Sequence, residues 1–251
     1  ENRTMTPPEK PSRYAGAPLA MMLSLADSRL PVGGHVHSGG VEQAIADGFI
    51  RGVSDLASFL HRRVTTSGLV AASIAAAVAD GGLDVERALQ ETDARTPSAA
   101  ARKASIAQGR GMLRLAKRMW PERDWSSHTP TTHLPVISGA VGAASALSGF
   151  HTALVLVYTT MSGSATAGQR LLALDPADVA LMIADLGPEC ERVAASAAVA
   201  PGIAMAQDIM MDRGPRGGPA GRPGPGGLRG RRPHPERRQR SPHPRPSHRL
   251  P

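Results

Sequence analysis

Apolar residues recur at helical spacing along most of this chain. Leu56, Phe59, Leu60 and Val64 stand at positions i, i+3, i+4 and i+8, which places their side chains on one face of an α-helix. Alternation with a period of two is sustained nowhere, except briefly over residues 154–160, so the expected strand content is near zero. The pattern predicts an all-α, single-domain bundle of roughly eight to ten helices.

Glycine, proline and capping residues divide the pattern into separate helices. Three short helices are expected over 19–26, 38–46 and 84–94, and a long helix capped by Ser54 runs to 79. Another helix starts at Thr96-Pro97 and reaches 119, and two helices within 135–172 are divided at Gly149. The last starts at Asp175-Pro176, breaks at Gly187-Pro188 and restarts toward 200.

Residues 129–169 contain no Lys, Arg, Asp or Glu and are long enough to span a bilayer. The segment also holds His133, His151 and Pro135, and no basic residue stands close to either edge as an interface anchor. We therefore favour two buried helices, with His151 in the apolar core, and expect no membrane association. A small membrane protein is the alternative.

Charge is distributed unevenly. The 251 residues carry a net charge of +8, but residues 213–251 hold eleven Arg and one Glu together with ten Pro, eight Gly and no aromatic residue. Such a segment cannot bury enough apolar surface to offset its chain entropy. We expect a disordered arm over 1–18, one all-α domain over 19–211, and a disordered tail over 212–251. Residues 1–212 have a net charge of −2, so the basic isoelectric point does not make the folded part a nucleic-acid binder.

No motif indicates an enzyme. The chain lacks a phosphate-binding G-x-x-x-x-G-K-[ST] loop. Ser38 is followed by Gly40 but lacks the first glycine and the preceding strand of a nucleophile elbow, so it is interpreted as a helix N-cap. The single cysteine, Cys190, excludes an internal disulfide and favours a reducing compartment, the cytoplasm.

Histidines are the remaining candidates for metal chemistry. His35 and His37 alternate, so in an extended segment both imidazoles could face one way and bind a metal such as nickel. His128 and His133 could add ligands, but no Cys or carboxylate stands at a clear ligand spacing beside either pair. We predict no metal site in this chain, with His35 and His37 as weak candidates.

The most informative stretch is residues 25–47, which read L-A-D-S-R-L-P-V-G-G-H-V-H-S-G-G-V-E-Q-A-I-A-D. This stretch predicts the end of one helix, a turn set by Pro31 and paired glycines, and a new helix that starts at Ser38. The string resembles the D/S-S-x-x-P-x-G-x-x-x-x-S-x-G-[LV]-E signature of the urease accessory protein F (UreF) family. Its fixed positions correspond to Ser28, Pro31, Gly33, Ser38, Gly40 and Glu42.

Two further segments resemble the same family, in the same order. His133-Leu134-Pro135-Val136, with Gly139 and Gly142, heads the uncharged region, and Gln169-Arg170-Leu171-Leu172-Ala173-Leu174 precedes Pro176 in the manner of the family's Q-x-x-L-L-x-L-x-P. Pro135 and Gly139 therefore join the signature residues as candidates for partner binding. Three ordered matches are more specific than any one of them.

The resemblance implies a non-catalytic chaperone of nickel-enzyme maturation. Members of the family are all-α and usually dimeric, and they join the accessory proteins D (also called H) and G on apo-urease. Protein G is a GTPase, and the F protein couples its nucleotide state to GTP-dependent nickel insertion. Nickel is then the delivered metal rather than a cofactor of this chain, and the expected location is the cytoplasm.

The C-terminal region departs from the family pattern. Family members end in an ordered segment that contacts partners and closes near Arg-Leu-Phe-x-Ser, whereas Asp212 is followed here by Arg-Gly-Pro-Arg-Gly-Gly. One hypothesis is a frameshift in GC-rich DNA, which would make the tail a product of the wrong reading frame. The alternative function is a helical scaffold whose basic tail binds nucleic acid non-specifically.

Overall fold

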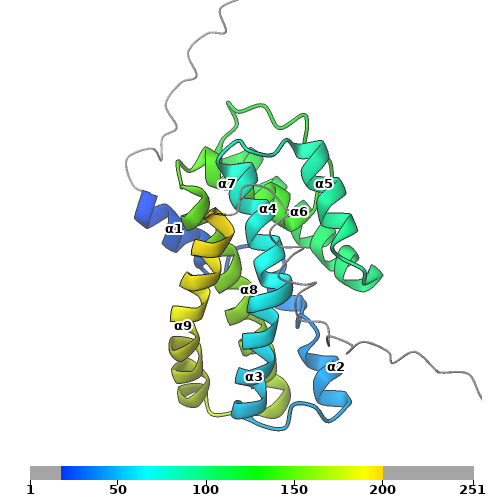
Figure 1. The fold of residues 1–251 in the computed structure, drawn as a ribbon, viewed down its shortest axis with the longest axis vertical. Helices are drawn as coiled ribbons and strands as arrows, with labels where there is room; N and C mark the ends of the chain where they lie inside the picture. The colour runs from blue at the N-terminus through cyan, green and yellow to red at the C-terminus, as the bar shows by residue number, and fades with distance from the viewer. Residues whose placement is uncertain (1–17, 200–251) are drawn as a thin grey trace, which may run out of the picture. The chain divides into compact units, whose positions relative to one another are not determined.

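A computed structural model describes residues 18–199 of the chain (Figure 1). In chain order its helices are α1 (Pro18–Ala26), η1 (Gly34–Val36), α2 (Val41–Ala46), α3 (Val53–Arg63), η2 (Val64–Gly68), α4 (Leu69–Ala79), α5 (Val85–Ala94), α6 (Ala99–Met119), α7 (Leu134–Ala144), α8 (Gly149–Leu172) and α9 (Pro176–Val199).

The predicted all-α fold is confirmed. Over residues 18–199 every regular element is helical, and none is a strand. Residues 154–160, where a brief alternation was the one hint of a strand, lie inside α8. Residue 18 belongs to α1, while the rest of the expected arm and the whole expected tail, over 1–17 and 212–251, lie outside the described residues.

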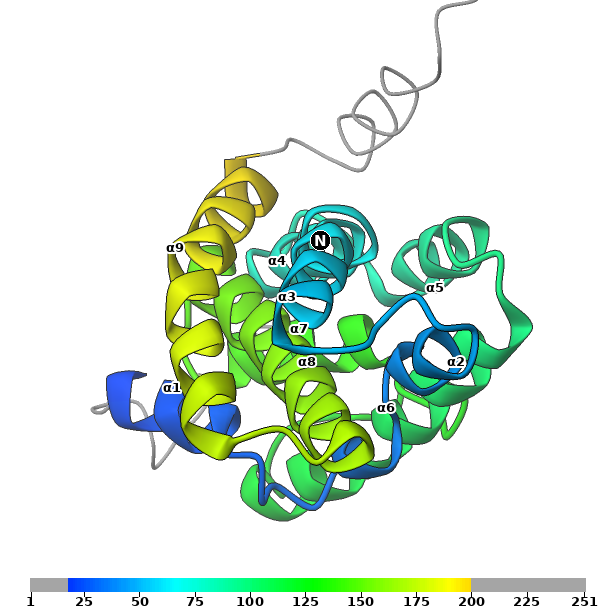
Figure 2. The ribbon, with the colours of Figure 1, turned by 90° about the horizontal axis from the view of Figure 1, so that it is seen from below.

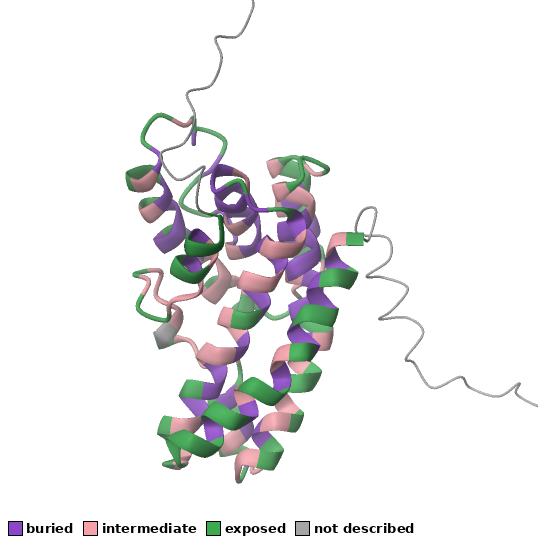
Figure 3. Cartoon of the chain, turned by 90° about the vertical axis from the view of Figure 1, so that its left-hand side faces the viewer, coloured by how far each residue is buried: buried purple, intermediate pink, exposed green. Residues whose placement is uncertain are grey.

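Helix α8 lies at the centre of the packing. It contacts α9, α4, α7, α1, α3 and α2, and Figure 2 shows it between α9 on one side and α6 on the other. The apolar side of α8 packs against these neighbours. Figure 3 shows a similar division into buried and exposed sides along the other helices. A helix with neighbours on several sides needs a wide apolar surface, which explains why residues 129–169 contain no charge.

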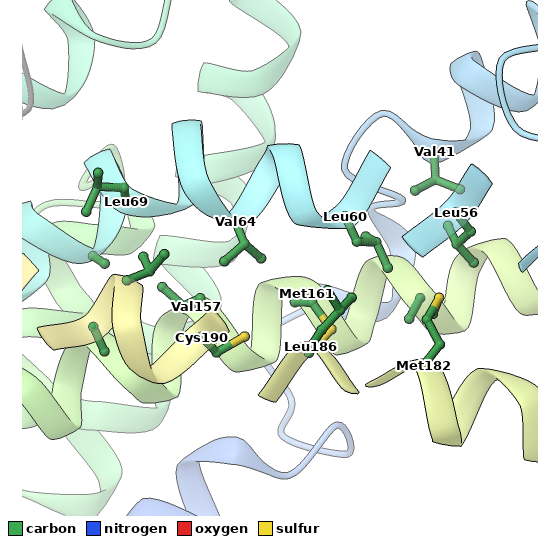
Figure 4. Close-up of a cluster of buried hydrophobic side chains, with 14 of the residues drawn as sticks. Val41, Leu56, Leu60, Val64, Leu69, Val157, Met161, Met182, Leu186 and Cys190 are labelled. Atoms are coloured by element: carbon green, nitrogen blue, oxygen red, sulfur yellow. The ribbon is translucent and has the colours of Figure 1, made fainter. Parts of the chain in front are cut away.

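Two apolar clusters form most of the interior. The larger one joins α3, α4, α8 and α9 and includes Leu56, Leu60, Val157, Met161 and Cys190 (Figure 4). The second joins α1, α6 and α7 around the loop between α6 and α7. It includes Met21, Leu25, Leu113, Trp120 and Ile137.

The uncharged region forms two packed helices, as the sequence predicted. Its residues make up α7 and most of α8, and many of them are buried against α4. None of the helices within residues 18–199 is long and apolar enough to cross a membrane. The membrane-protein alternative therefore finds no spanning helix in this part of the chain.

Small residues in α7 allow neighbouring helices to approach closely. A Cβ atom on Gly139 would lie 2.6 Å from Val78 Cβ and 2.7 Å from the Ala75 carbonyl oxygen of α4. A Cβ atom on Gly142 would lie 2.7 Å from Thr152 Cγ2 of α8. Real Cβ atoms do not approach so closely, so glycine is required at both contacts.

Several helix starts differ from the sequence predictions. Helix α3 begins at Val53, and Ser54 lies inside its first turn rather than at the N-cap, because the Asp55 carboxylate accepts a hydrogen bond from the Arg51 backbone N–H at 3.0 Å. Helix α6 begins after Ser98, whose hydroxyl accepts from the Ala101 N–H at 3.3 Å, and not at Thr96-Pro97. At α6 the Ser98 hydroxyl satisfies a free first-turn donor in place of the expected cap, whereas no side chain caps α3.

The long helix expected over 54–79 contains a π-helical turn, η2. The hydroxyls of Thr65 and Thr66 donate to backbone carbonyl oxygens one turn earlier, at 3.0 and 2.7 Å. Side-chain donors of this kind compete with the backbone N–H groups for the same carbonyls. This competition accounts for the wider turn, and such π segments often accompany functional sites.

Helix α9 does not break at Gly187-Pro188, so the predicted interruption is wrong. Pro188 removes one backbone N–H, but it lies on the exposed side of the helix, where the freed carbonyl of Ala184 can bind water. His151 also differs from its prediction as a core residue. It is half-buried in the first turn of α8, and its Nδ1 lies 2.9 Å from the hydroxyl of the N-cap residue Ser148.

Candidate functional site

The candidate site is centred on residues 27–42, here called the signature loop, which connects α1 to the first turn of α2. At its start the Asp27 carboxylate accepts hydrogen bonds from the backbone N–H and the guanidinium of Arg29, at 2.8 Å and 2.7–3.1 Å. These bonds from Arg29 hold the pKa of Asp27 at about 2. Ser28 and Pro31 are exposed in the turn that follows.

Glycines set the path of the loop. Gly33, Gly39 and Gly40 have φ angles of 78°, 66° and 93°, in the left-handed region that a side chain disfavours. Gly40 is the N-cap residue of α2, and the Ser38 hydroxyl accepts a hydrogen bond from the Glu42 backbone N–H at 3.3 Å. The prediction of Ser38 as the N-cap residue is therefore wrong, because α2 begins at Val41 after Gly40. The Ser38 hydroxyl still satisfies one free backbone donor of the first turn.

Glu42 points away from these contacts. It is exposed in the first turn of α2, and its carboxylate has no hydrogen bond or ion pair with the residues that the structure describes. A carboxylate at this position is favoured by the helix dipole. The loop thus presents an exposed carboxylate that has no partner among the described residues.

Helix α6 supports the signature loop from one side. A Cβ atom on Gly111 would lie 2.8 Å from both Cα and the carbonyl oxygen of Val32, so the two backbones are in direct contact. Gly111 is buried although α6 has an exposed face. A glycine inside a helix costs about 1 kcal/mol relative to alanine, and the close approach of the loop explains its presence.

Arg63 supports the loop from the other side. It is the last residue of α3, directly before the π-helical turn, and its Nη1 donates to the Gly39 carbonyl oxygen at 2.6 Å. Burial lowers the pKa of the Arg63 guanidinium, but an arginine side chain stays protonated in proteins at neutral pH. No carboxylate among the described residues pairs with it.

The second family-like segment meets the same helix. His133 is buried, and its Nε2 lies 3.2 Å from Asp93 Oδ1. Pro135 is buried near the first turn of α7, and a Cβ atom on Gly109 of α6 would lie 3.0 Å from the backbone at His133 and Leu134. The structure therefore brings the first two segments onto α6, at two glycines only two positions apart.

The third family-like segment forms the end of α8 and the turn to α9. Ala173 adopts a left-handed conformation with φ of 50°, and Leu171 is exposed. Directly before the segment, a Cβ atom on Gly168 would lie 2.7 Å from Leu56 Cδ2 of α3. Leu172 and Leu174 of the segment itself pack against the larger apolar cluster, which includes Leu56 of α3.

Sequence reasoning missed Arg63, Gly109 and Gly111. Two glycines separated by one residue in the middle of a predicted helix were a usable signal, because glycine there is unfavourable unless another backbone approaches closely. Arg63 gave no comparable signal. Exposed Arg62 precedes it, and only the packing of the loop distinguishes the two.

The histidines do not assemble into a metal cluster in the part of the chain that the structure describes. No group of three or more His, Cys, Asp or Glu side chains there is placed to hold a metal ion. His128 is buried and packs edge-on against Trp125, at 5.6 Å between ring centroids. His35 lies in η1 and His37 directly after it. That the chain has no metal site, with this pair as weak candidates, stays a prediction.

Cys190 is fully buried in the larger apolar cluster, and burial raises the pKa of its thiol to about 11. At pH 8 a raised pKa leaves less of the reactive thiolate, so iodoacetamide should alkylate the folded protein about two orders of magnitude more slowly than the urea-unfolded protein. Mass spectrometry of the single cysteine measures both rates. Equal rates would show that the thiol is accessible in the folded chain.

Known proteins share much of this amino-acid sequence. A family model described as UreF matches residues 51–187. The chain is 61% identical over 183 residues to a "Urease accessory protein UreF" of Mycobacterium sp. (strain JLS), covering 73% of this chain and 87% of that protein. It is 57% identical over 194 residues to a protein of the same name from Mycobacterium marinum (strain ATCC BAA-535 / M), covering 77% and 91%.

Proposed function

Because the chain belongs to the UreF family of urease accessory proteins, we propose that it acts with the accessory proteins D/H and G in GTP-dependent insertion of nickel into apo-urease. Membership implies a role in urease maturation as an accessory protein rather than as a catalytic enzyme. In the proposal, the chain modulates the GTPase activity of protein G. It works in the cytoplasm as a homodimer, and nickel is the delivered metal.

The observation that carries the proposal is the fixed and outward-facing signature loop. Arg63 and Gly111 hold the loop from two sides, while Glu42 remains exposed and without a partner in the described residues. A preorganised loop loses little conformational entropy when a partner binds. This arrangement suits a docking scaffold.

Complementation tests the function in a strain that carries the urease genes but lacks its own copy of this protein. The full chain should restore urease activity and the nickel content of purified urease, and it should raise or lower the GTP hydrolysis rate of protein G. Restoration of neither activity nor nickel, with normal expression of the chain, would contradict the proposal. Sedimentation of the purified chain reports the dimer independently.

Replacement of Glu42 should separate function from stability. Glu42→Ala is expected to leave helical circular dichroism and melting temperature close to wild type, because the side chain is exposed and unpaired, but to lower urease activation several-fold. Glu86→Ala is the matched control, since Glu86 is also an exposed acid in the first turn of a helix. The helix-dipole contribution, about 0.3–1 kcal/mol, is then similar in both variants. Equal activation by the two variants would remove Glu42 from the partner surface.

A further inference from the structure

One face of α6 carries a dense row of basic side chains. At 100° per residue these side chains project within about 100° of arc, over a length of about 22 Å, and they are all exposed. The residues are Lys103, Arg110, Arg114, Lys117 and Arg118. The opposite side of the helix packs into the interior through Met112, Leu113 and Ala116.

This basic face has no charge partner within residues 18–199. None of its five side chains forms an ion pair there, and the only hydrogen bond found for them joins Arg110 Nε to the Pro130 carbonyl oxygen at 3.3 Å. Helix α6 carries six basic and no acidic residues, whereas the other described residues carry nine Lys+Arg and sixteen Asp+Glu. Like charges on one helix face repel each other by a few tenths of a kcal/mol per pair. The row of basic side chains therefore lowers the stability of the protein when no partner is bound.

The basic face borders the signature loop. Gly111, which contacts Val32 of the loop, stands directly after Arg110 and three residues before Arg114. At 100° per residue Gly111 lies beside the basic side chains on the helix, so the contact with the loop is at the edge of the basic face.

We propose that the basic face of α6 binds an acidic surface of another protein in the urease accessory complex. The inference rests on the proposed function, because it takes the signature loop to be a partner surface and assigns the neighbouring charges to the same contact. Arginine and lysine at one-turn spacing match a row of carboxylates on a facing helix or strand. The partner is thus defined by its chemistry, a protein surface with several exposed carboxylates.

Two observations favour a protein over nucleic acid. The net charge of the described residues is −1, from fifteen Lys+Arg and sixteen Asp+Glu, so this part of the chain has no long-range attraction for a polyanion. Helix α6 also lacks aromatic residues on which bases could stack. An acidic patch on a protein requires only the local positive charge that α6 provides.

A second copy of the chain fits less well. Of the described helices, α9 carries the most exposed carboxylates, Asp178, Asp185 and Glu191. Figures 1 and 2 show α9 and α6 on opposite sides of α8. Contact between α6 of one copy and α9 of the next would be heterologous and would continue into an open chain rather than close as a dimer.

A pair of matched double variants tests the proposal in the full chain. Arg114→Gln with Arg118→Gln removes two charges from the basic face, and Arg51→Gln with Arg62→Gln removes two exposed arginines elsewhere. Both variants change the net charge equally and keep residues 213–251, so any contribution of the tail is the same. Binding of each protein is measured to purified accessory proteins D/H and G, to apo-urease, and to a DNA duplex of about 30 base pairs, at about 50 and about 300 mM salt.

The expected result is a loss of affinity of about tenfold for one of the three protein partners in the α6 variant, with a weaker salt dependence than wild type. The control variant should stay within about twofold of wild type, and the α6 variant should bind DNA as wild type does. Unchanged affinity for all three proteins would overturn the proposal. So would a loss confined to DNA, or a loss of self-association by sedimentation. If wild type activates urease while the α6 variant is unimpaired, only this inference fails; if wild type neither binds nor activates, the proposed function fails.

Discussion

Gly109→Ala is expected to destabilise the protein, although alanine is the better helix former. The new Cβ atom would collide with the Thr132 carbonyl oxygen and lie 3.0 Å from both the His133 carbonyl carbon and the Leu134 nitrogen. These are backbone atoms, so they cannot move aside as the end of a flexible side chain can. Overpacking of this kind costs roughly 1–3 kcal/mol or more, which exceeds the gain of about 1 kcal/mol in helix propensity.

The matched control for Gly109 is Gly163→Ala in the middle of α8. A Cβ atom at Gly163 would meet no atom within 4 Å, so only the helix propensity changes, and the variant should be stabilised by about 0.5–1 kcal/mol. The two identical substitutions should therefore shift the free energy of unfolding in opposite directions. Urea unfolding followed by circular dichroism measures both values, and a stabilised Gly109→Ala would show that α6 and the His133 segment are farther apart than described.

Arg63→Leu is expected to impair urease activation far more than it impairs folding. A hydrogen bond from a charged donor contributes about 1.5–3 kcal/mol. Its loss at the Gly39 carbonyl should lower the ratio of docked to undocked signature loop by about tenfold or more. Stability of the bundle should change little, because leucine fills part of the same space and the cost of burying an unpaired guanidinium disappears.

Arg62→Leu is the control for Arg63, because Arg62 is adjacent in sequence but exposed. Urease activation in the complementing strain should fall several-fold for Arg63→Leu and stay near wild type for Arg62→Leu. Amide hydrogen exchange provides a readout that does not depend on partners. Exchange should accelerate in residues 33–42 and remain unchanged in α4 and α8. Uniform acceleration in Arg63→Leu would instead indicate global destabilisation.

Much of the fold followed from local features of the sequence. The spacing of Leu56, Leu60 and Val64 determined a helix and its buried face, and all three residues lie in the larger apolar cluster. Asp84, the first residue of the helix expected over 84–94, caps α5 by accepting a hydrogen bond from the Arg87 backbone N–H at 2.8 Å. Helical period and capping depend on residues within one or two turns, so the sequence contains the whole cause.

The family, too, was identifiable from the sequence, because three short segments in a fixed order resembled it. The sequence did not show that the first two segments meet on α6 or why the third packs elsewhere. It also pointed to Ser54, Thr96-Pro97 and Gly187-Pro188 as helix ends, and the structure placed each of them differently. Those positions depend on which neighbouring oxygen satisfies a free donor and on whether a proline faces solvent.

The support of the candidate site was decided by tertiary structure. Arg62 and Arg63 have the same side chain, and only the approach of the Gly39 carbonyl makes one of them a positioning residue for the loop. Gly109 and Gly111 are unfavourable within their own helix and are explained by backbones 20 or more residues away in sequence. The sequence by itself determined the helices and the family, because their causes are local. Contacts between distant segments depend on how the helices pack, and only the folded chain determines them.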